Sequence, residues 1–240
     1  MTKTNFVNYA HRGASSYAPE NTFAAFYKGI EMGANGIETD VQSTKDGVFV
    51  LHHDDTLERL CGINKKVSDF TLGELRELDF GVYFGEKYIG EKIVTLEDFL
   101  IYFSSKPITL AIEIKQDGIE LDVYEMCKQF LKREQYYITS FSLDAILNLA
   151  ELEEPPRLGF LAGGFSDIIT DVLYNADVEQ YCPYGPELSK EQMKYLRNVG
   201  FSNIRAWGIS DTEIMKEVYY LGVDGMTVNF PDKLKELILL

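Results

Sequence analysis

The chain has 240 residues, of which 45% are hydrophobic, and it contains 15 tyrosines and 15 phenylalanines. This length fits a single α/β barrel, for which about 250 residues is typical, and the composition supplies one large core. The formal net charge of −15 at pH 7 argues against nucleic acid and against an anionic membrane surface as main partners. A small anionic substrate remains compatible with this charge if a metal ion or local Arg and Lys side chains offset it at the site.

The cysteines and the start of the chain predict a cytoplasmic protein. Cys61, Cys127 and Cys182 show no metal-binding spacing and are typical of reduced intracellular thiols. No positively charged leader with an apolar core precedes residue 11, and no apolar run reaches about 18 residues. We therefore expect no stable membrane anchor, and the sequence leaves the oligomeric state open.

Predicted strands and helices alternate along the chain, which is typical of βα units around a parallel sheet. The strands are expected at 6–10, 36–41, 48–53, 108–115, 136–140, 157–161, 178–182, 202–207 and 225–228. The helices are expected at 20–33, 118–133, 142–151, 167–176, 189–199, 211–221 and 231–239. Asn21, Ser189 and Asp211 have the side chains of helix N-caps.

Nine strands are one more than a closed (β/α)8 barrel needs, and the extra strand is predicted at 48–53. Only residues 42–47 separate it from the preceding strand, whereas a parallel crossover needs about a dozen or more. Asp46-Gly47 is typical of a hairpin turn. The sequence therefore predicts a TIM barrel of eight parallel strands with an extra antiparallel hairpin strand.

Residues 54–107 interrupt the alternation. They contain an amphipathic helix near 71–78, an aromatic loop at 81–85 and a second helix near 95–104. We interpret this segment as a small insertion over the C-terminal face of the barrel, where the active sites of such barrels lie. Residues 1–240 are then a single domain with the insertion inside it.

Two predicted strands carry charged residues at positions i and i+2, which point to the same face of a strand. Glu38 and Asp40 are such a pair, and Glu113 and Lys115 are another. Carboxylates inside a barrel need a cation, and Mg²⁺ or Ca²⁺ prefers oxygen ligands. The alternatives are solvated acids on an exposed strand and an internal Glu–Lys pair.

Histidines stand at the ends of two predicted strands. His11 precedes Arg12, whose guanidinium can bind two phosphate oxygens. A hairpin turn centred on residues 45–46 or 46–47 places His53 opposite Glu38 or Asp40, respectively. Histidine can exchange a proton near neutral pH.

These residues, in this order, resemble the glycerophosphodiester phosphodiesterase family over nearly the whole chain. The motifs that carry the resemblance are His11-Arg12-Gly13, Pro19-Glu20-Asn21-Thr22, Glu38-Thr39-Asp40, His53-Asp54-Asp55-Thr56-Leu57, Thr95-Leu96-Glu97, Glu113-Ile114-Lys115, Ser140-Phe141, Trp207, Gly222-Val223-Asp224-Gly225 and Asn229-Phe230-Pro231-Asp232. The chain departs from the family at Glu58-Arg59-Leu60-Cys61, Val94 and Gly208-Ile209-Ser210, which concerns the pocket for the alcohol rather than the chemistry.

The resemblance implies metal-dependent hydrolysis of glycerophosphodiesters to sn-glycerol 3-phosphate and an alcohol. The implied roles are acid–base catalysis by His11 and His53, binding of one Mg²⁺ or Ca²⁺ by Glu38, Asp40 and Glu113, substrate binding by Arg12, Lys115 and Trp207, and support of the loop by Glu20 and Asn21. His52 is expected to be structural.

Two other functions remain open at this point. A phospholipase D-type enzyme acting on lysophospholipids is favoured by the aromatic loop at 81–84, although the acidic charge opposes it. A barrel that binds phosphodiesters without turnover is expected to lack a histidine or a metal carboxylate, and this chain lacks neither. The sequence leaves open which alcohol is released and whether Mg²⁺ or Ca²⁺ is bound.

Overall fold

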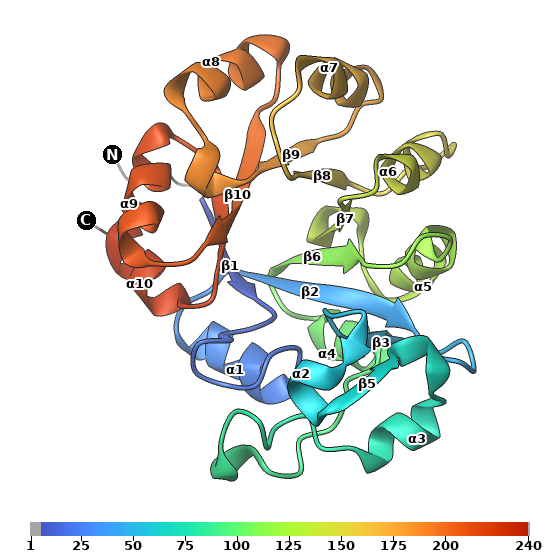
Figure 1. Cartoon of the computed structure of the whole chain (residues 1–240). Helices are drawn as coiled ribbons and strands as arrows, with labels where there is room; N and C mark the ends of the chain where they lie inside the picture. Colours follow the sequence, from blue (N-terminus) through green and yellow to red (C-terminus); the bar gives the residue numbers. More distant parts are fainter. Residues whose placement is uncertain (1–5, 240) are drawn as a thin grey trace.

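A closed barrel of eight parallel strands forms the centre of the computed structural model, which describes residues 6–239 (Figure 1). The strands follow one another in chain order, and the barrel closes because β1 pairs with both β2 and β11. The barrel strands are β1 (Val7–His11), β2 (Gly36–Ser43), β6 (Thr109–Ile114), β7 (Tyr136–Ser140), β8 (Leu158–Ala162), β9 (Gln180–Pro183), β10 (Asn203–Ile209) and β11 (Gly225–Val228). The predicted (β/α)8 fold is confirmed.

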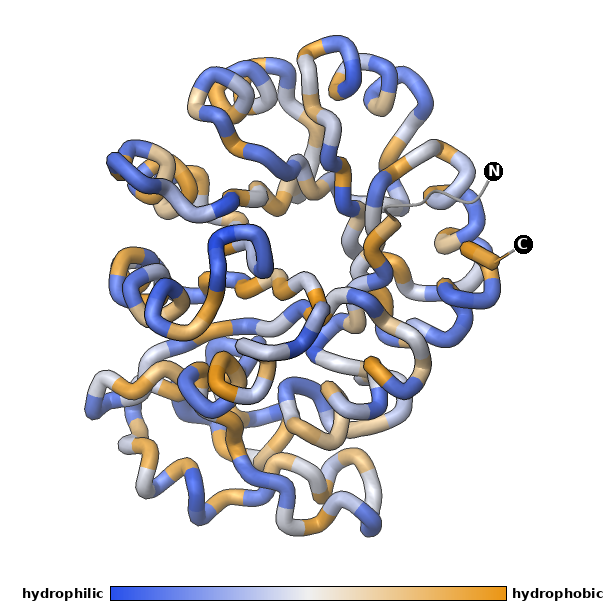
Figure 2. Tube along the Cα trace, turned by 180° about the vertical axis from the view of Figure 1, so that it is seen from behind, coloured by the Kyte–Doolittle hydropathy of each residue, from blue (hydrophilic) through white to orange (hydrophobic). Residues whose placement is uncertain are grey.

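Helices surround the barrel and turn their apolar sides towards the strands, while hydrophilic residues face outward (Figure 2). They are α1 (Phe23–Glu31), α4 (Leu96–Phe103), α5 (Glu120–Phe130), α6 (Leu143–Ala150), α7 (Asp167–Asn175), α8 (Lys190–Val199), α9 (Thr212–Leu221) and α10 (Pro231–Ile238). Short 3-10 turns, η3 (Arg133–Gln135) and η4 (Gly185–Glu187), lie between some of them. One apolar core therefore fills the space between strands and helices.

Side-chain caps define where several helices begin. The Ser189 and Asp211 side chains accept hydrogen bonds from backbone N–H groups in the first turns of α8 and α9, as predicted. The prediction for Asn21 was wrong, because Thr22 caps α1. The Asn21 side chain is instead bonded to strand β2, so it links the loop to the sheet.

The extra strand is β3 (Phe49–Leu51), which pairs antiparallel with β2. Its register differs from both predicted ones: Leu51 pairs with Val41, and the His52 N–H donates to the Asp40 carbonyl at 3.0 Å. The turn contains one more residue than a two-residue hairpin, and Gly47 takes a positive φ of 78°. The prediction that His53 lies opposite a carboxylate in the ladder was therefore wrong, because the strand ends before it.

Residues 54–94 form the insertion beside β2 and β3. It comprises β4 (Thr56–Leu57), α2 (Glu58–Cys61), β5 (Ile63–Lys66), η1 (Val67–Asp69), α3 (Leu72–Glu77) and η2 (Glu86–Tyr88) around a small apolar cluster. Its aromatic loop and η2 both contact the β1–α1 loop, since the Glu20 N–H donates to the Tyr83 hydroxyl and the Tyr88 hydroxyl donates to the Tyr17 carbonyl. The insertion therefore supports the loop that follows His11.

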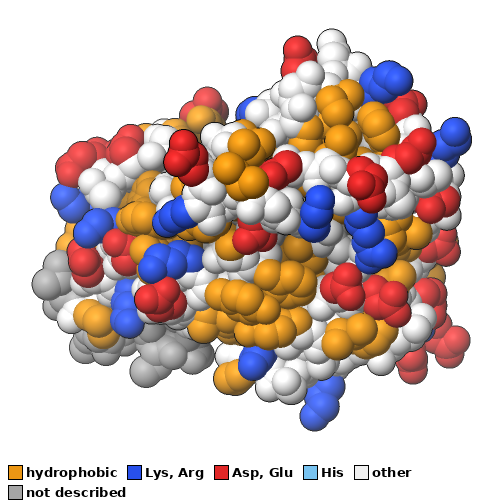
Figure 3. Space-filling model, turned by 90° about the horizontal axis from the view of Figure 1, so that it is seen from below, with side chains coloured by type: hydrophobic (Ala, Val, Ile, Leu, Met, Phe, Trp, Pro, Cys, Tyr) orange, Lys and Arg blue, Asp and Glu red, His pale blue; other side chains and the backbone are white. Residues whose placement is uncertain are grey.

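The helix predicted near 95–104 is α4, and it belongs to the helices that surround the barrel. Phe99 packs against Phe26 of α1 with ring centroids 4.9 Å apart. On the outside of this pair, Tyr27 lies against Tyr102. Figure 3 views the molecule from below and shows hydrophobic side chains gathered in the middle of that face, with charges of both signs around them. Within residues 6–239, none of the helices has the length and apolar character needed to span a bilayer.

Candidate active site

A cavity of about 300 Å³ opens at the C-terminal end of the barrel strands. One side is polar and is lined by His11, Arg12, Glu38, His53 and Glu113, and the other side is lined by apolar residues that include Phe141, Leu161 and Trp207. Among the described residues, no lining residue comes from 54–107. The C-terminal end is where barrel enzymes carry their catalytic residues.

Three carboxylates converge at the polar side. Asp40 on β2 pairs in register with Glu113 on β6, and Glu38 lies two residues before Asp40. One ligand oxygen from each lies within 4.8 Å of the others, and all three side chains are buried. The Asp40 Oδ1 atom has no hydrogen-bond partner within residues 6–239. A buried acceptor of this kind calls for a cation, so the three residues fit a divalent metal ion.

Electrostatics distinguish the three carboxylates. Burial, and then repulsion from Asp40, raises the pKa of both Glu38 and Glu113. Burial also acts to raise the pKa of Asp40, but nearby cations, with Arg12 the strongest, outweigh it and leave that pKa lowered. Repulsion among three carboxylates in a buried site favours binding of a cation.

Two basic side chains neutralise part of this charge. Arg12 Nε lies 3.2 Å from Asp40 Oδ2, and Lys115 Nζ donates to Glu113 Oε1 at 2.8 Å. Arg12 lines the cavity, whereas Lys115 lies beside it with its ammonium group 5.8 Å from the centre of the Phe141 ring. Arg12 directly follows β1 and Lys115 directly follows β6, so both cations reach the carboxylates from the ends of barrel strands.

The β1–α1 loop holds Arg12 in an unusual backbone conformation. Arg12 and Asn21 both have φ of +55°, a left-handed value that is uncommon outside glycine. The Asn21 N–H donates to the Arg12 carbonyl at 2.9 Å, and the Asn21 side chain donates to Asp40 Oδ2 at 2.9 Å. Gly13, at φ +83°, lets the loop pass within contact of Ala25 on α1. Such conformations cluster at functional sites, where the surrounding structure enforces them.

His11 stands half-buried at the end of β1, with 30% of its side chain exposed, and its two ring nitrogens differ. Nδ1 lies 2.5 Å from the side-chain oxygen of Asn229, and Nε2 lies 3.9 Å from Glu38 Oε2. An Nδ1–H that donates to Asn229 leaves Nε2 with a free lone pair. Burial, followed by the charge of Arg12, lowers the pKa of His11 to about 4. A neutral His11 therefore has Nε2 available to accept a proton.

His53 follows β3 and has a carboxylate partner. Its Nδ1 lies 2.8 Å from Asp54 Oδ1, and Asp54 Oδ2 accepts from Arg59 Nε at 2.6 Å. Arg59 also makes two bonds of 2.7 Å to Glu20, which in turn accepts from Arg12 at 3.0 Å. These ion pairs connect the loop after β1 with the second histidine.

The adjacent His52 is buried, and its Nε2 lies 3.1 Å from the Thr56 carbonyl, which agrees with its expected structural role.

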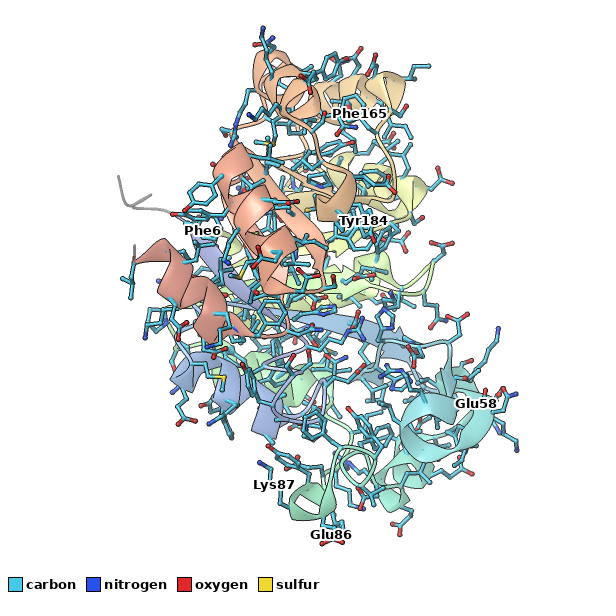
Figure 4. The ribbon with its side chains drawn as sticks, turned by 60° about the vertical axis from the view of Figure 1, so that its left-hand side comes forward. Phe6, Glu58, Glu86, Lys87, Phe165 and Tyr184 are labelled. Atoms are coloured by element: carbon cyan, nitrogen blue, oxygen red, sulfur yellow. The ribbon has the colours of Figure 1, made fainter. Side chains whose placement is uncertain are left out.

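Aromatic rings form the apolar side of the cavity. The Trp207 ring packs edge-on against Phe141 with ring centroids 4.9 Å apart, and its centroid lies 4.8 Å from that of Tyr184. The indole N–H donates to the Ala162 carbonyl at 3.3 Å, which fixes the orientation of the ring. In Figure 4, Tyr184 lies at the barrel, whereas Glu58 and Glu86 of the insertion lie at the periphery. Trp207 thus forms part of the apolar wall of the cavity.

The structure places each predicted site residue in or beside the cavity, and it adds three that the sequence analysis did not single out. Asn229 orients His11, Arg59 joins Glu20 to Asp54, and Arg205 lies at the base of the cavity. Asn229 stood inside a recognised motif, so its position was available as a signal, whereas Arg59 stood in a segment where the chain departs from the family. Arg205 had only the i, i+2 spacing to Trp207, which is too short a pattern to select it.

Comparisons with known proteins agree on the identity of this barrel. The family model described as "Glycerophosphoryl diester phosphodiesterase family" matches residues 11–233. A glycerophosphodiester phosphodiesterase of Caldanaerobacter subterraneus subsp. tengcongensis is 33% identical, with 95% of this chain and 96% of that protein covered. The uncharacterized protein YqiK of Bacillus subtilis is 34% identical, with 96% and 97% covered.

A solved structure adds a bound product. The phosphodiesterase of Oleispira antarctica in complex with sn-glycerol-3-phosphate superposes with a TM-score of 0.89 at 26% identity, covering 98% of this chain and 97% of that one. Fold and site together define a (β/α)8 barrel enzyme of the phosphoric diester hydrolase class. The chain belongs to the glycerophosphoryl diester phosphodiesterase family.

Proposed function

We propose that this protein hydrolyses glycerophosphodiesters to sn-glycerol 3-phosphate and an alcohol, with His11 and His53 as the acid–base pair. The observation that carries the proposal is the convergence of both histidines, three buried carboxylates and Arg12 on one cavity. The family assignment and the product bound by the Oleispira enzyme support the same reaction.

Glu38, Asp40 and Glu113 would hold one divalent cation, Mg²⁺ or Ca²⁺, which when bound offsets charge on the phosphate and acidifies a coordinated hydroxyl. Three convergent carboxylates with an unpartnered oxygen support this choice of ligands. Their hard oxygen donors favour these ions over zinc.

The two histidines divide the proton transfers. His11 Nε2 accepts the proton of the glycerol 2-hydroxyl as its oxygen attacks phosphorus, because the bond from Nδ1 to Asn229 leaves that nitrogen free. His53, paired with Asp54, gives a proton to the departing alcohol oxygen. Water then opens the cyclic phosphate with the roles exchanged, so that His53 accepts the water proton and His11 returns a proton to the 2-oxygen.

Arg12 and Lys115 bind the non-bridging phosphate oxygens in this proposal. Arg12 lines the cavity, and Lys115 lies beside Glu113 at its edge. Trp207 flanks the substrate. Glu20 and Asn21 hold the loop, because Glu20 bonds Arg12 and Asn21 bonds Asp40. The proposed setting is the cytoplasm, with a small water-soluble diester as the substrate.

The test is release of glycerol 3-phosphate from a panel of glycerophosphodiesters with Mg²⁺, with Ca²⁺ and with EDTA. His53→Ala and Glu113→Ala are assayed in parallel, and the surface variant Lys190→Ala is the control. Metal-dependent release that both site variants abolish supports the proposal, and the panel ranks the alcohols. If the wild type releases no glycerol 3-phosphate from the glycerophosphodiesters but cleaves lysophospholipids, the proposed function is overturned in favour of the lipid-directed reaction.

A further inference from the structure

Arg205 is a buried cation at the base of the cavity that the proposed reaction does not use. Its side chain is 1% exposed, and it lines the cavity together with Thr227. It stands on β10 two residues before Trp207, so both side chains point into the barrel. Its guanidinium lies 5.1 Å from the centre of the Tyr9 ring.

One nitrogen of this guanidinium has no strong acceptor among residues 6–239. Nε donates to Gln180 Oε1 at 2.9 Å and Nη1 donates to Thr227 Oγ1 at 2.8 Å. Nη2 is buried and has no hydrogen-bond partner within residues 6–239. The Cys182 side chain is a hydrogen-bond partner of Arg205, but its thiol also donates to Gln180 Oε1, and a thiol sulfur is only a weak acceptor. A buried charged donor that has at best a weak sulfur acceptor is costly, so its retention points to a ligand oxygen.

The shape of the site indicates which part of the substrate reaches this donor. In the proposed reaction the phosphate lies between the two histidines near Arg12, all of which line the cavity. The alcohol differs among glycerophosphodiesters and needs the open side, where Phe141 and Ser210 are exposed. The glycerol unit is common to all of them and is left with the enclosed base, where Arg205 and Thr227 supply the polar groups.

We propose that Arg205 and Thr227 form a hydroxyl-binding subsite that takes the free terminal hydroxyl of the glycerol unit and selects for an intact glycerol. Arg205 Nη2 donates to the hydroxyl oxygen, and Thr227 holds the guanidinium in place through Nη1. A ligand without this hydroxyl leaves the donor unpartnered, which is the situation in which a buried polar site discriminates strongly. The proposal rests on the proposed function, since it deepens the specificity of the same site.

The test compares two ligands that differ by this hydroxyl alone. Sn-glycerol 3-phosphate and propane-1,2-diol 1-phosphate of matching configuration both keep the phosphate and the 2-hydroxyl. Their dissociation constants are measured by calorimetry with Mg²⁺-loaded wild type, Arg205→Met, Arg205→Lys and Thr227→Val. Arg197→Met is the control, because Arg197 bonds Asp224 and backbone carbonyls outside the cavity.

We expect wild type and Arg197→Met to bind glycerol phosphate about 10- to 100-fold more tightly than the deoxy analogue. This preference falls to about 2-fold or less in Arg205→Met and to an intermediate value in Arg205→Lys and Thr227→Val. If Arg205→Met does not fold, the preference of the wild type and its fall to an intermediate value in Thr227→Val decide the outcome.

Three results overturn the subsite: equal binding of the two ligands by wild type, an unchanged preference in the variants, or no binding of either phosphate. A purely structural arginine lowers the melting temperature without changing the preference. Failure of the proposed function is distinguishable, because wild type then discriminates between the ligands while releasing no glycerol phosphate from any diester.

Discussion

Replacing Arg59 with alanine is expected to lower kcat about 10- to 100-fold and to leave the fold intact. Arg59 joins Glu20 and Asp54 through bonds of 2.7, 2.7 and 2.6 Å, and Asp54 in turn holds Nδ1 of His53. Complete loss of an acid–base histidine costs about 10² to 10⁴ in rate. Loss of Arg59 removes the orientation of His53 but not the imidazole, so the effect falls below that range or at its lower end.

The expected change in stability is small. The Arg59 side chain is 45% exposed, so solvent screens its ion pairs. Each of the three bonds then contributes about 0.5 kcal/mol, and the free energy of unfolding falls by about 1 to 1.5 kcal/mol. Urea denaturation measures this change, and initial rates with a glycerophosphodiester at saturating Mg²⁺ measure kcat and KM.

The matched control is Arg133→Ala. Arg133 also bonds a glutamate, Glu179, at 2.7 Å and is 51% exposed, but it lies away from the cavity. By the same figure per bond, Arg133→Ala should lower the free energy of unfolding by about 0.5 to 1 kcal/mol and leave kcat unchanged. Equal kcat values for the two variants refute the reasoning that the ion pairs through Arg59 orient His53.

Asn229→Ala removes the acceptor for His11 Nδ1, and initial rates should show kcat reduced about 10-fold or more with little change in KM; an unchanged kcat contradicts the role given to this bond. Glu113→Gln should weaken Mg²⁺ and Ca²⁺ binding in calorimetry by about 10-fold or more, and undiminished binding removes it from the ligand set. Gly13 has φ +83°, and the Cβ of Gly13→Ala would lie 2.4 Å from the backbone of Ala25. The free energy of unfolding, measured by thermal denaturation, should therefore fall by about 2 kcal/mol or more, and an unchanged melting temperature contradicts this reasoning. Burial lowers the pKa of His52, so the unfolded chain takes up the proton first as the pH falls below about 6.5. The free energy of unfolding of the wild type should then fall by up to about 1.4 kcal/mol per pH unit, and that of His52→Gln should fall measurably less over the same range. Urea denaturation at several pH values measures both, and parallel pH profiles contradict the role given to His52.

The barrel could be predicted because its signals are local. The local signals are the alternating strands and helices, the turn at Asp46-Gly47, and the i, i+2 spacing within the pairs Glu38/Asp40 and Glu113/Lys115. Parallel neighbours share an orientation, so residues on the inward faces of β2 and β6 had to meet. The cap of α1 was misplaced by one residue because Asn21 and Thr22 both have capping side chains.

The remaining features depend on contacts between distant parts of the chain. The hairpin register was wrong because a turn with Gly47 in the left-handed region adds a residue, which the sequence does not distinguish from a two-residue turn. Arg205 was missed because an isolated arginine in a strand is usually exposed. Its burial follows from Gln180 and Thr227, which lie 25 and 22 residues away.

The central claim is that the two histidines and three carboxylates form one centre that leaves the phosphate on glycerol. Phosphorus NMR of glycerophosphocholine incubated with the Mg²⁺-loaded protein tests it most directly, with Glu113→Gln in parallel. We predict that the wild type replaces the diester signal with that of sn-glycerol 3-phosphate, and that the variant does so at least about 100-fold more slowly. An unchanged diester signal, or a signal of phosphocholine, would contradict the account.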